Sequence, residues 1–357
     1  MQNKPALRSG WTTGACATAA AKAAFTALLS GAFPDPVEIV LPRGQRVAFA
    51  LADSVLAGGV ARAAIVKDAG DDPDVTHGAL IRVSVRAGAP GAGVVFCAGE
   101  GVGTVTRPGL PIPPGEPAIN PVPRQMIRAA VAEVAAALGG AGDVVVEIAI
   151  PGGEEMARRT LNGRLGIIGG LSVLGTTGIV VPFSCAAWID SIHRSIDVAR
   201  AMGLAHVAGA TGRASEQAVQ ALYGLDDVAL VEMGDFVGGM LKYLRAHPVA
   251  RVTVAGGIGK ITKLAQGRLD LHSKRGAVDF AALAGFAAAL GADPARIAAA
   301  NTAAEAFTLA GDIGLGDTIA RAAWTTAAKA LDRNDTALDV VIFDRDGALV
   351  GRADHAG

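Results

Sequence analysis

The chain has 357 residues, of which 51% are hydrophobic and 18% are charged. This composition excludes a disordered protein, and the length exceeds what one compact domain usually needs. Lys and Arg total 32 against 33 Asp and Glu, so the sequence lacks the basic excess typical of a nucleic-acid-binding protein. The 3 cysteines, Cys16, Cys97 and Cys185, are far apart, which favours free thiols in the cytoplasm over a disulfide framework or a zinc site.

Residues 1–150 are predicted to form a mixed α+β domain. A helix over about residues 15–29 follows a glycine turn, and Thr12 or Thr13 can cap its N-terminus. A Gly- and Pro-rich segment over 99–124 is long enough to favour a functional loop. The remaining predicted elements are a hairpin over 37–52 around Arg43-Gly44, strands over 79–87, 93–98 and 143–150, and a helix that carries Ile127, Val131, Val134 and Leu138 on one face.

Residues 151–357 are predicted to form an α/β domain with a parallel, helix-flanked sheet, because strands and helices alternate there. The stretch 165–189 has no charged residue and could span a bilayer by length. Its glycines and Pro182 favour two short strands instead, so no membrane segment is expected. The other predicted elements are a helix with Ile189, Ile192, Ile196 and Ala199 in phase, strands over 205–210, 228–233 and 251–255 with helices between them, two or three helices over 278–330, and a terminal strand pair turning at Asp346-Gly347.

Glycine-rich turns follow each of the three predicted parallel strands. Ligands bind beyond the carboxyl ends of such strands, and a following helix N-terminus with Ser215 as its cap suits an anion. Glu232 lies close to the offset from Gly209 at which an acidic residue meets a ribose in dinucleotide folds. No phosphate-loop motif is complete, so tight turns and capping explain each turn alone better than a ligand does. Three such turns in succession favour a nucleoside-type ligand. The candidates are Gly209, Thr211, Gly212, Ser215, Glu232, Asp235, Gly257, Gly259 and Lys260.

Two further groups of side chains could carry chemistry. The acidic run 67–78 offers Asp68, Asp72 and His77 for acid–base work or metal binding, although a solvated turn with capping carboxylates fits it as well. Basic residues lie in loops near glycines, and guanidinium groups there would suit a ligand with several carboxylates. No histidine pairs with a cysteine or another histidine at metal-ligand spacing, so no protein-bound metal is expected.

Several segments together resemble one family, the CbiD-type cobalt-precorrin-5B C1-methyltransferases of cobalamin biosynthesis. They occur in the expected order from the N-terminus to about residue 276, and Trp11 stands where Tyr or Phe is more usual. The segments are 7–24 (LRSGWTTGACATAAAKAA), 67–78 (KDAGDDPDVTHG), 99–110 (GEGVGTVTRPGL), 115–124 (GEPAINPVPR), 151–180 (PGGEEMARRTLNGRLGIIGGLSVLGTTGIV), 234–241 (GDFVGGML) and 257–276 (GIGKITKLAQGRLDLHSKRG).

The resemblance implies S-adenosylmethionine as methyl donor and a cobalt-containing tetrapyrrole as substrate, methylated at C1 to give cobalt-precorrin-6A. It implies a fold unlike the usual tetrapyrrole methyltransferases, no metal site of the protein's own, and neighbouring corrin-pathway enzymes as candidate partners. The strand-end turns would hold the donor, with Glu232 or Asp235 on its ribose, and Asp68, Asp72 or His77 would take up a proton. The substrate-binding candidates are Thr12, Thr13, Arg107, Arg124, Arg164, Thr176 and Thr177.

Two other functions remain open from the residues alone. A phosphotransferase would use the glycine-rich turns and Lys260 to hold phosphates and Asp235 to hold a metal. A non-catalytic tetrapyrrole carrier would bind the macrocycle and have no affinity for the methyl donor.

Overall fold

The computed structural model describes residues 7–354 and divides into two compact units, Met1–Ser184 and Cys185–Gly357. The predicted boundary after residue 150 differs from this division, because the segment 151–184 packs with the first unit. Its short strand β10 (Ile167–Ile168) pairs with β8 (Thr104–Val105). Its second strand, β11 (Ile179–Val180), pairs with β1 (Gly10–Trp11) near the N-terminus.

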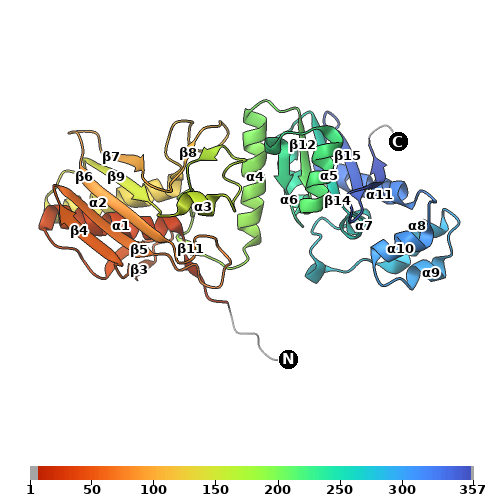
Figure 1. The fold of residues 1–357 in the computed structure, drawn as a ribbon, viewed down its shortest axis with the longest axis horizontal. Helices are drawn as coiled ribbons and strands as arrows, with labels where there is room; N and C mark the ends of the chain where they lie inside the picture. Colours follow the sequence, from red (N-terminus) through yellow and green to blue (C-terminus); the bar gives the residue numbers. More distant parts are fainter. Residues whose placement is uncertain (1–6, 355–357) are drawn as a thin grey trace. The chain divides into compact units, whose positions relative to one another are not determined.

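A five-stranded sheet with the order β4-β5-β6-β9-β7 forms the centre of the first unit (Figure 1). Helix α1 (Thr13–Ser30) packs on β5 and β6 and against α2 (Pro121–Leu138). Because α1 is rich in alanine and is buried along most of its length, it can lie inside the unit with close neighbours on most sides. The other elements of this unit are β2 (Val37–Val40), β3 (Arg46–Phe49), β4 (Asp53–Ala57), β5 (Val60–Val66), β6 (Leu80–Ala87), β7 (Val94–Ala98), β9 (Val144–Ala149) and α3 (Gly153–Ala157).

The second unit contains a sheet with the order β13-β12-β14-β15-β16, in which the first four strands are parallel and β16 is antiparallel. Helices cover both faces of this sheet, so the predicted fold class is confirmed. The elements are α4 (Cys185–Ala201), β12 (His206–Ala210), α5 (Arg213–Tyr223), β13 (Leu230–Glu232), α6 (Val237–Ala246), β14 (Arg251–Gly257), α7 (Ile258–Ala265), α8 (Phe280–Ala288), α9 (Pro294–Ala298), α10 (Ala303–Ala310), α11 (Leu315–Leu331), β15 (Ala337–Phe343) and β16 (Leu349–Ala353), with 3-10 turns at Asp227–Ala229 and Ser273–Arg275.

The strand order places a topological switch point between β12 and β14. The chain runs outward from β12 to the edge strand β13 and then crosses to β14 on the other side of β12. At such a point the loops that follow the two central strands diverge and leave a crevice beyond their carboxyl ends. The turns after β12 and β14 are therefore placed to border a ligand site.

The alanine-rich segment 278–330 is divided more finely than the sequence predicts. The structure has α8, α9, α10 and α11 there, where two or three helices were expected. Asp293 and Thr302 each start a new helix, because their side chains accept backbone N–H groups of Ala295 and Glu305. Without these caps, the alanine-rich composition of the segment would favour one long helix.

The charge-free stretch 165–189 forms β10, β11 and the start of α4, as the glycines in it predicted. Within residues 7–354, no helix has both the length and the apolar character needed to cross a bilayer.

Candidate functional site

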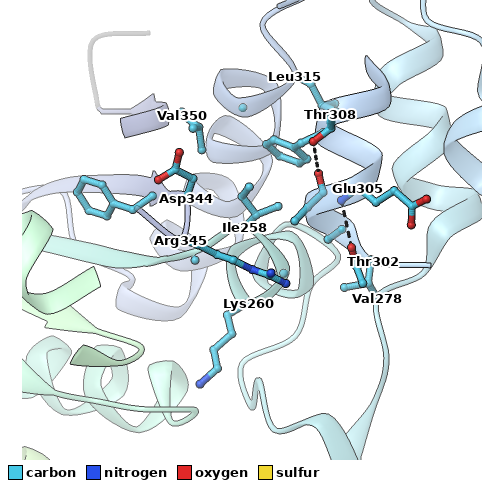
Figure 2. A pocket seen from close by; sticks show the side chains of 18 of the residues that line it. Ile258, Lys260, Val278, Thr302, Glu305, Thr308, Leu315, Asp344, Arg345 and Val350 are labelled. Atoms are coloured by element: carbon cyan, nitrogen blue, oxygen red, sulfur yellow. Dashed lines mark hydrogen bonds between the residues drawn. The ribbon is translucent and has the colours of Figure 1, made fainter. Parts of the chain in front are cut away.

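The second unit has a large cleft beyond the carboxyl ends of β12, β14 and β15. Its volume is about 1810 Å³, more than the roughly 300–1,000 Å³ of an ordinary small-molecule site. One wall consists of the turns after β12 and β14, and the opposite wall contains α10 with Thr302, Glu305 and Thr308 (Figure 2). The turn between β15 and β16 and the start of α11 complete it. The cleft has room for a nucleoside ligand and part of a second reactant.

Most of the strand-end residues predicted from the sequence line this cleft. They are Thr211, Gly212, Ser215, Gly257, Gly259 and Lys260. Gly212 and Gly257 have backbone conformations open to any residue, with φ angles of 169° and −74°. A Cβ atom at either position would meet no atom within 4 Å. Neither backbone strain nor packing therefore requires glycine at these two positions. Because glycine has no side chain, the wall of the cleft stays open to a ligand there.

Gly209, Glu232 and Asp235 do not line the cleft. A Cβ atom on Gly209 would lie 2.2 Å from the sulfur of Met240, so this glycine serves the packing of α6 on the sheet. Glu232 and Asp235 lie at the end of the edge strand β13, and the Glu232 carbonyl accepts a hydrogen bond from the Trp188 indole at 3.1 Å. The geometry gives no support to either carboxylate as a ribose partner in the cleft.

Lys260 is held by two partners outside the cleft's centre. Its Nζ donates to the Thr211 carbonyl at 3.0 Å and lies 2.8 Å from Oδ1 of Asp235. That oxygen is buried and makes no hydrogen bond within the described chain, so the ion pair compensates its charge. Figure 2 shows the Lys260 side chain directed away from the wall that carries Glu305 and Thr308.

The helices that follow β12 and β14 begin at the cleft without side-chain caps. Helix α5 has Gly212 as its N-cap and α7 has Gly257. The prediction that Ser215 caps α5 is wrong, because Ser215 lies inside the first turn and its hydroxyl donates to the Gly212 carbonyl at 2.8 Å. Uncapped N–H groups at a helix start favour a negatively charged ligand group.

The predicted acid–base residue Asp68 lies in the first unit and is paired with Arg8. The Arg8 guanidinium donates to both carboxylate oxygens, and the Gly70 N–H donates to one of them at 2.9 Å. These interactions lower the pKa of Asp68 to about 2. Asp68 is therefore ionised at neutral pH and is a poor proton acceptor there.

Asp72 and His77 border a smaller cavity of about 530 Å³ in the first unit, together with Arg159. Asp72 accepts the Phe183 N–H at 2.8 Å, and Nδ1 of His77 accepts the Ala69 N–H at 3.1 Å. Both side chains thus hold the acidic loop in shape while facing this cavity.

The two Thr-Thr-Gly segments, at 12–14 and 176–178, lie side by side in the first unit. The Thr12 N–H donates to the Gly178 carbonyl and the Gly14 N–H to the Leu174 carbonyl, both at 3.0 Å. Thr12 caps α1 by accepting the Ala15 N–H at 3.2 Å, as predicted. Thr12 and Thr13 are buried, Thr176 is exposed, and Thr177 donates to the Ile179 carbonyl at 3.1 Å.

The structure brings two of the three predicted substrate arginines together. Arg107 donates to the Arg164 carbonyl at 2.6 Å. Arg124 instead donates to the carbonyls of Ile119 and Pro117 at 2.8 and 3.0 Å and to Glu116 at 3.1 Å. Its guanidinium is thus largely used in holding the segment before α2.

Sequence reasoning missed the α10 wall and the turn after β15. Thr302, Glu305 and Thr308 carry no motif, and their place in the cleft follows only from tertiary packing. Arg345, which comes two residues after β15 ends, lines the cleft as well. The rule that ligands bind beyond parallel strands would have found Arg345 if it had been applied to the fourth parallel strand.

The comparisons with known proteins agree with the sequence resemblance. The CbiD family model matches residues 1–182, and the model described as CbiD, C-terminal domain, matches residues 270–354. The chain belongs to the CbiD family. A crystal structure of the cobalamin biosynthesis protein CbiD from Archaeoglobus fulgidus is 27% identical, covers 75% of this chain and 83% of its own, and has a TM-score of 0.41.

Curated CbiD relatives match this chain over almost its whole length. The relative from Bradyrhizobium sp. is 63% identical over 99% of this chain and 96% of its own. Those from Agrobacterium fabrum and Halorhodospira halophila are 61% and 63% identical, over 97% and 98% of this chain and 93% and 95% of their own. All three are named cobalt-precorrin-5B C(1)-methyltransferase.

Proposed function

We infer that this CbiD protein is a cobalt-precorrin-5B C(1)-methyltransferase of cobalamin biosynthesis. The observation that carries this conclusion is the 63% identity to a relative of that name over 99% of the chain. The match spans 99% of this chain and therefore extends over both units. The substrate is then a cobalt-containing tetrapyrrole that accepts a methyl group at ring carbon C1.

We propose S-adenosylmethionine as the methyl donor, with the cleft of the second unit as its site. The donor combines an adenosine with a carboxylate, an ammonium and a sulfonium, so its site needs both signs of charge. The cleft lining provides as many basic as acidic side chains: Arg213, Lys260, Lys263, Arg345 and Arg352 against Glu305, Asp312, Asp317, Asp344 and Asp346. The open positions beside Gly212 and Gly257 leave space for the donor against the strand ends.

The donor supplies an electrophilic methyl group, which a nucleophilic ring carbon displaces from sulfur. The protein then has to align the two reactants and exclude water, and the reaction requires no covalent nucleophile from the protein. The Thr211-Gly212 and Gly257-Ile258 turns would fix the donor, since Lys260 and the two helix starts hold those turns in place. Glu232 and Asp235 are left out of the donor site.

For the tetrapyrrole we propose the first unit. Arg107, Arg164 and the exposed Thr176 offer polar groups to the acidic side chains of the macrocycle, while Asp72 and His77 are the groups available for proton uptake. Thr12, Thr13, Thr177 and Arg124 would act by shaping this region. The separated free thiols favour a cytoplasmic enzyme.

The test is incubation of the purified protein with cobalt-precorrin-5B and methyl-labelled S-adenosylmethionine, followed by mass analysis of the tetrapyrrole. One added labelled methyl, lost when the donor is omitted, is the expected result. Binding of the macrocycle without transfer would favour a carrier instead. Binding of magnesium–ATP would favour a phosphotransferase, although Lys260, paired with Asp235, is poorly placed to hold phosphates.

A further inference from the structure

Arg345 is a cation of the cleft that belongs to none of the glycine-rich turns predicted from the sequence. It follows β15 in the short turn that leads to β16, and the Asp344 carboxylate fixes this turn by accepting the N–H groups of Asp346 and Ala348 at 2.9 and 2.8 Å. In Figure 2 the Arg345 side chain extends into the cleft, between Ile258 and Lys260 in this view. A rigid turn thus presents a guanidinium group to the cleft near the start of α7.

The guanidinium of Arg345 makes no hydrogen bond or ion pair with any residue in 7–354, in contrast to the lysines nearby. Lys260 is held by Thr211 and Asp235, and Nζ of Lys263 donates to the Leu271 carbonyl at 3.0 Å. Each lysine would therefore have to give up these contacts in order to bind a ligand. Arg345 keeps its full set of donors available for a ligand.

We propose that Arg345 binds the carboxylate of the methionine part of the methyl donor. The inference rests on the proposed function, because it takes S-adenosylmethionine as the ligand of the cleft. The carboxylate is the donor's one anionic group, and a guanidinium binds a carboxylate through two parallel hydrogen bonds. The uncapped start of α7 favours a negative group at the same end of the cleft.

This contact would also set the direction in which the donor lies. Arg345 repels the ammonium and sulfonium groups, whereas the carboxylate of Glu305 on the opposite wall attracts them. Oε2 of Glu305 accepts the backbone N–H and the side-chain amide of Asn301 at 2.8 and 3.2 Å, and these hydrogen bonds do not neutralise the carboxylate. The carboxylate therefore lies toward the β15–β16 turn, with the cationic groups away from it. Arg345 acts as a residue for donor binding and orientation.

The experiment measures the dissociation constants of S-adenosylmethionine and of its decarboxylated analogue by titration calorimetry, for the wild-type protein and for Arg345→Gln. Loss of a charge-assisted, bidentate contact is expected to weaken S-adenosylmethionine binding by about tenfold or more. The decarboxylated analogue has only cationic charged groups, so it should bind Arg345→Gln at least as tightly as it binds the wild-type protein. The preference of the wild-type protein for the carboxylated donor should therefore disappear in Arg345→Gln.

Two further variants serve as controls. Arg321→Gln changes an exposed arginine of α11 that does not line the cleft, and it should leave both dissociation constants unchanged. Arg213→Gln changes the other cleft arginine without a partner in the described chain, at the start of α5. If Arg213 acts only through the general charge of the cleft, its loss should not weaken binding of either cationic donor and should favour the decarboxylated one more. Thermal unfolding shows that each variant is folded.

Several outcomes would overturn the proposal. Equal loss of affinity for both donors in Arg345→Gln, or no loss at all, would show that the donor carboxylate does not meet this residue. Unchanged donor affinity with weakened binding of the cobalt tetrapyrrole would assign Arg345 to a carboxylate of the macrocycle. With either of these outcomes, methyl transfer by the wild-type protein would leave the proposed function standing. A wild-type protein that binds no S-adenosylmethionine would overturn both the proposed function and the role of Arg345.

Discussion

The ammonium of Lys260 lies 2.8 Å from the carboxylate of Asp235 and 3.0 Å from the carbonyl oxygen of Thr211. These three residues follow three different parallel strands, so one side chain joins the ends of β14, β13 and β12. This link helps to hold the Thr211-Gly212 turn, which lines the cleft, together with the Thr211 N–H, which donates to the Ala255 carbonyl at 3.0 Å. Lys260 is best understood as a residue that positions the site.

Breaking this link should weaken donor binding more than it weakens the fold. In Lys260→Met the Thr211 carbonyl and the Asp235 carboxylate lose their common partner, and we expect a severalfold rise in the donor's dissociation constant. The free energy of unfolding should fall by about 1 kcal/mol, because the ion pair is partly exposed. Titration calorimetry and urea denaturation measure the two effects, with Lys242→Met on the surface of α6 as control.

The same link predicts coupling between Lys260 and Asp235. If the two act as a pair, Asp235→Asn should add little to the loss of affinity already caused by Lys260→Met. Fully additive effects in the double variant would instead mean that each residue meets the donor separately.

The cleft glycines and the core glycine should respond in opposite ways to substitution. Gly257→Val places its side chain in open space, so the melting temperature should change little while the donor binds more weakly. Gly209→Ala places a Cβ atom 2.2 Å from the sulfur of Met240, and overpacking of this kind costs roughly 1–3 kcal/mol. Calorimetric melting and donor titration of both variants separate these effects. A destabilised Gly257→Val that binds donor normally would contradict the assignment of this wall.

The sequence was most informative where one physical rule acts locally. Apolar periodicity predicted α2 and α4, and the turn signal at Asp346-Gly347 predicted the terminal pair β15 and β16. The same rule missed β5, whose buried face consists of Ala61, Ala63 and Ile65 and packs on α1. Its other face also carries apolar residues, Val60, Ala64 and Val66, so the sequence does not show the alternation of apolar and polar residues from which a strand is predicted.

The cleft was only half predictable for a similar reason. That ligands bind beyond parallel strands is a property of the fold, and it correctly placed Thr211, Gly212 and Gly257. Which carboxylate faces the ligand depends on the order of strands in the sheet. Glu232 ends the edge strand β13, whereas the cleft lies on the other side of β12, beyond β14 and β15. Strand order is set by tertiary packing and leaves no local trace in the sequence.

Arg124 should matter first for the stability of the first unit. Arg124→Gln removes hydrogen bonds to Ile119, Pro117 and Glu116 and the contact of the guanidinium with the Phe96 ring at 5.3 Å. We expect a loss of about 1–3 kcal/mol in the free energy of unfolding, since buried carbonyls lose their partners.

Arg128→Gln is the matched control for this change. Arg128 lies one helical turn further along α2 and contacts the same Phe96 ring at 5.1 Å. No hydrogen bond of its side chain is found within residues 7–354, so its loss should cost well under half as much. Urea denaturation of the two variants gives the comparison. Equal stability of both, with loss of tetrapyrrole affinity in Arg124→Gln alone, would instead show direct substrate binding by Arg124.

The pairing of Asp68 with Arg8 should contribute stability that depends on pH. The hydrogen bond from Arg8 lowers the pKa of Asp68 from its ordinary value of 3.8 to about 2. A carboxyl group whose pKa is lower in the folded state stabilises the fold above its unfolded pKa and loses that contribution as the pH falls through the folded value. The effect is therefore complete above about pH 4 and disappears toward pH 2. It should be modest, because both side chains are substantially exposed.

Asp68→Asn tests this linkage directly. The variant should unfold at a lower urea concentration than the wild-type protein at pH 7, and the difference should shrink between about pH 4 and pH 2 because the wild-type carboxyl group becomes protonated there. Methyl transfer by Asp68→Asn at pH 7 should stay within a few-fold of the wild-type rate if Asp68 holds the loop 67–78 and takes up no proton. A loss of transfer by several orders of magnitude in a variant that still binds both reactants would restore Asp68 as the group that accepts the proton.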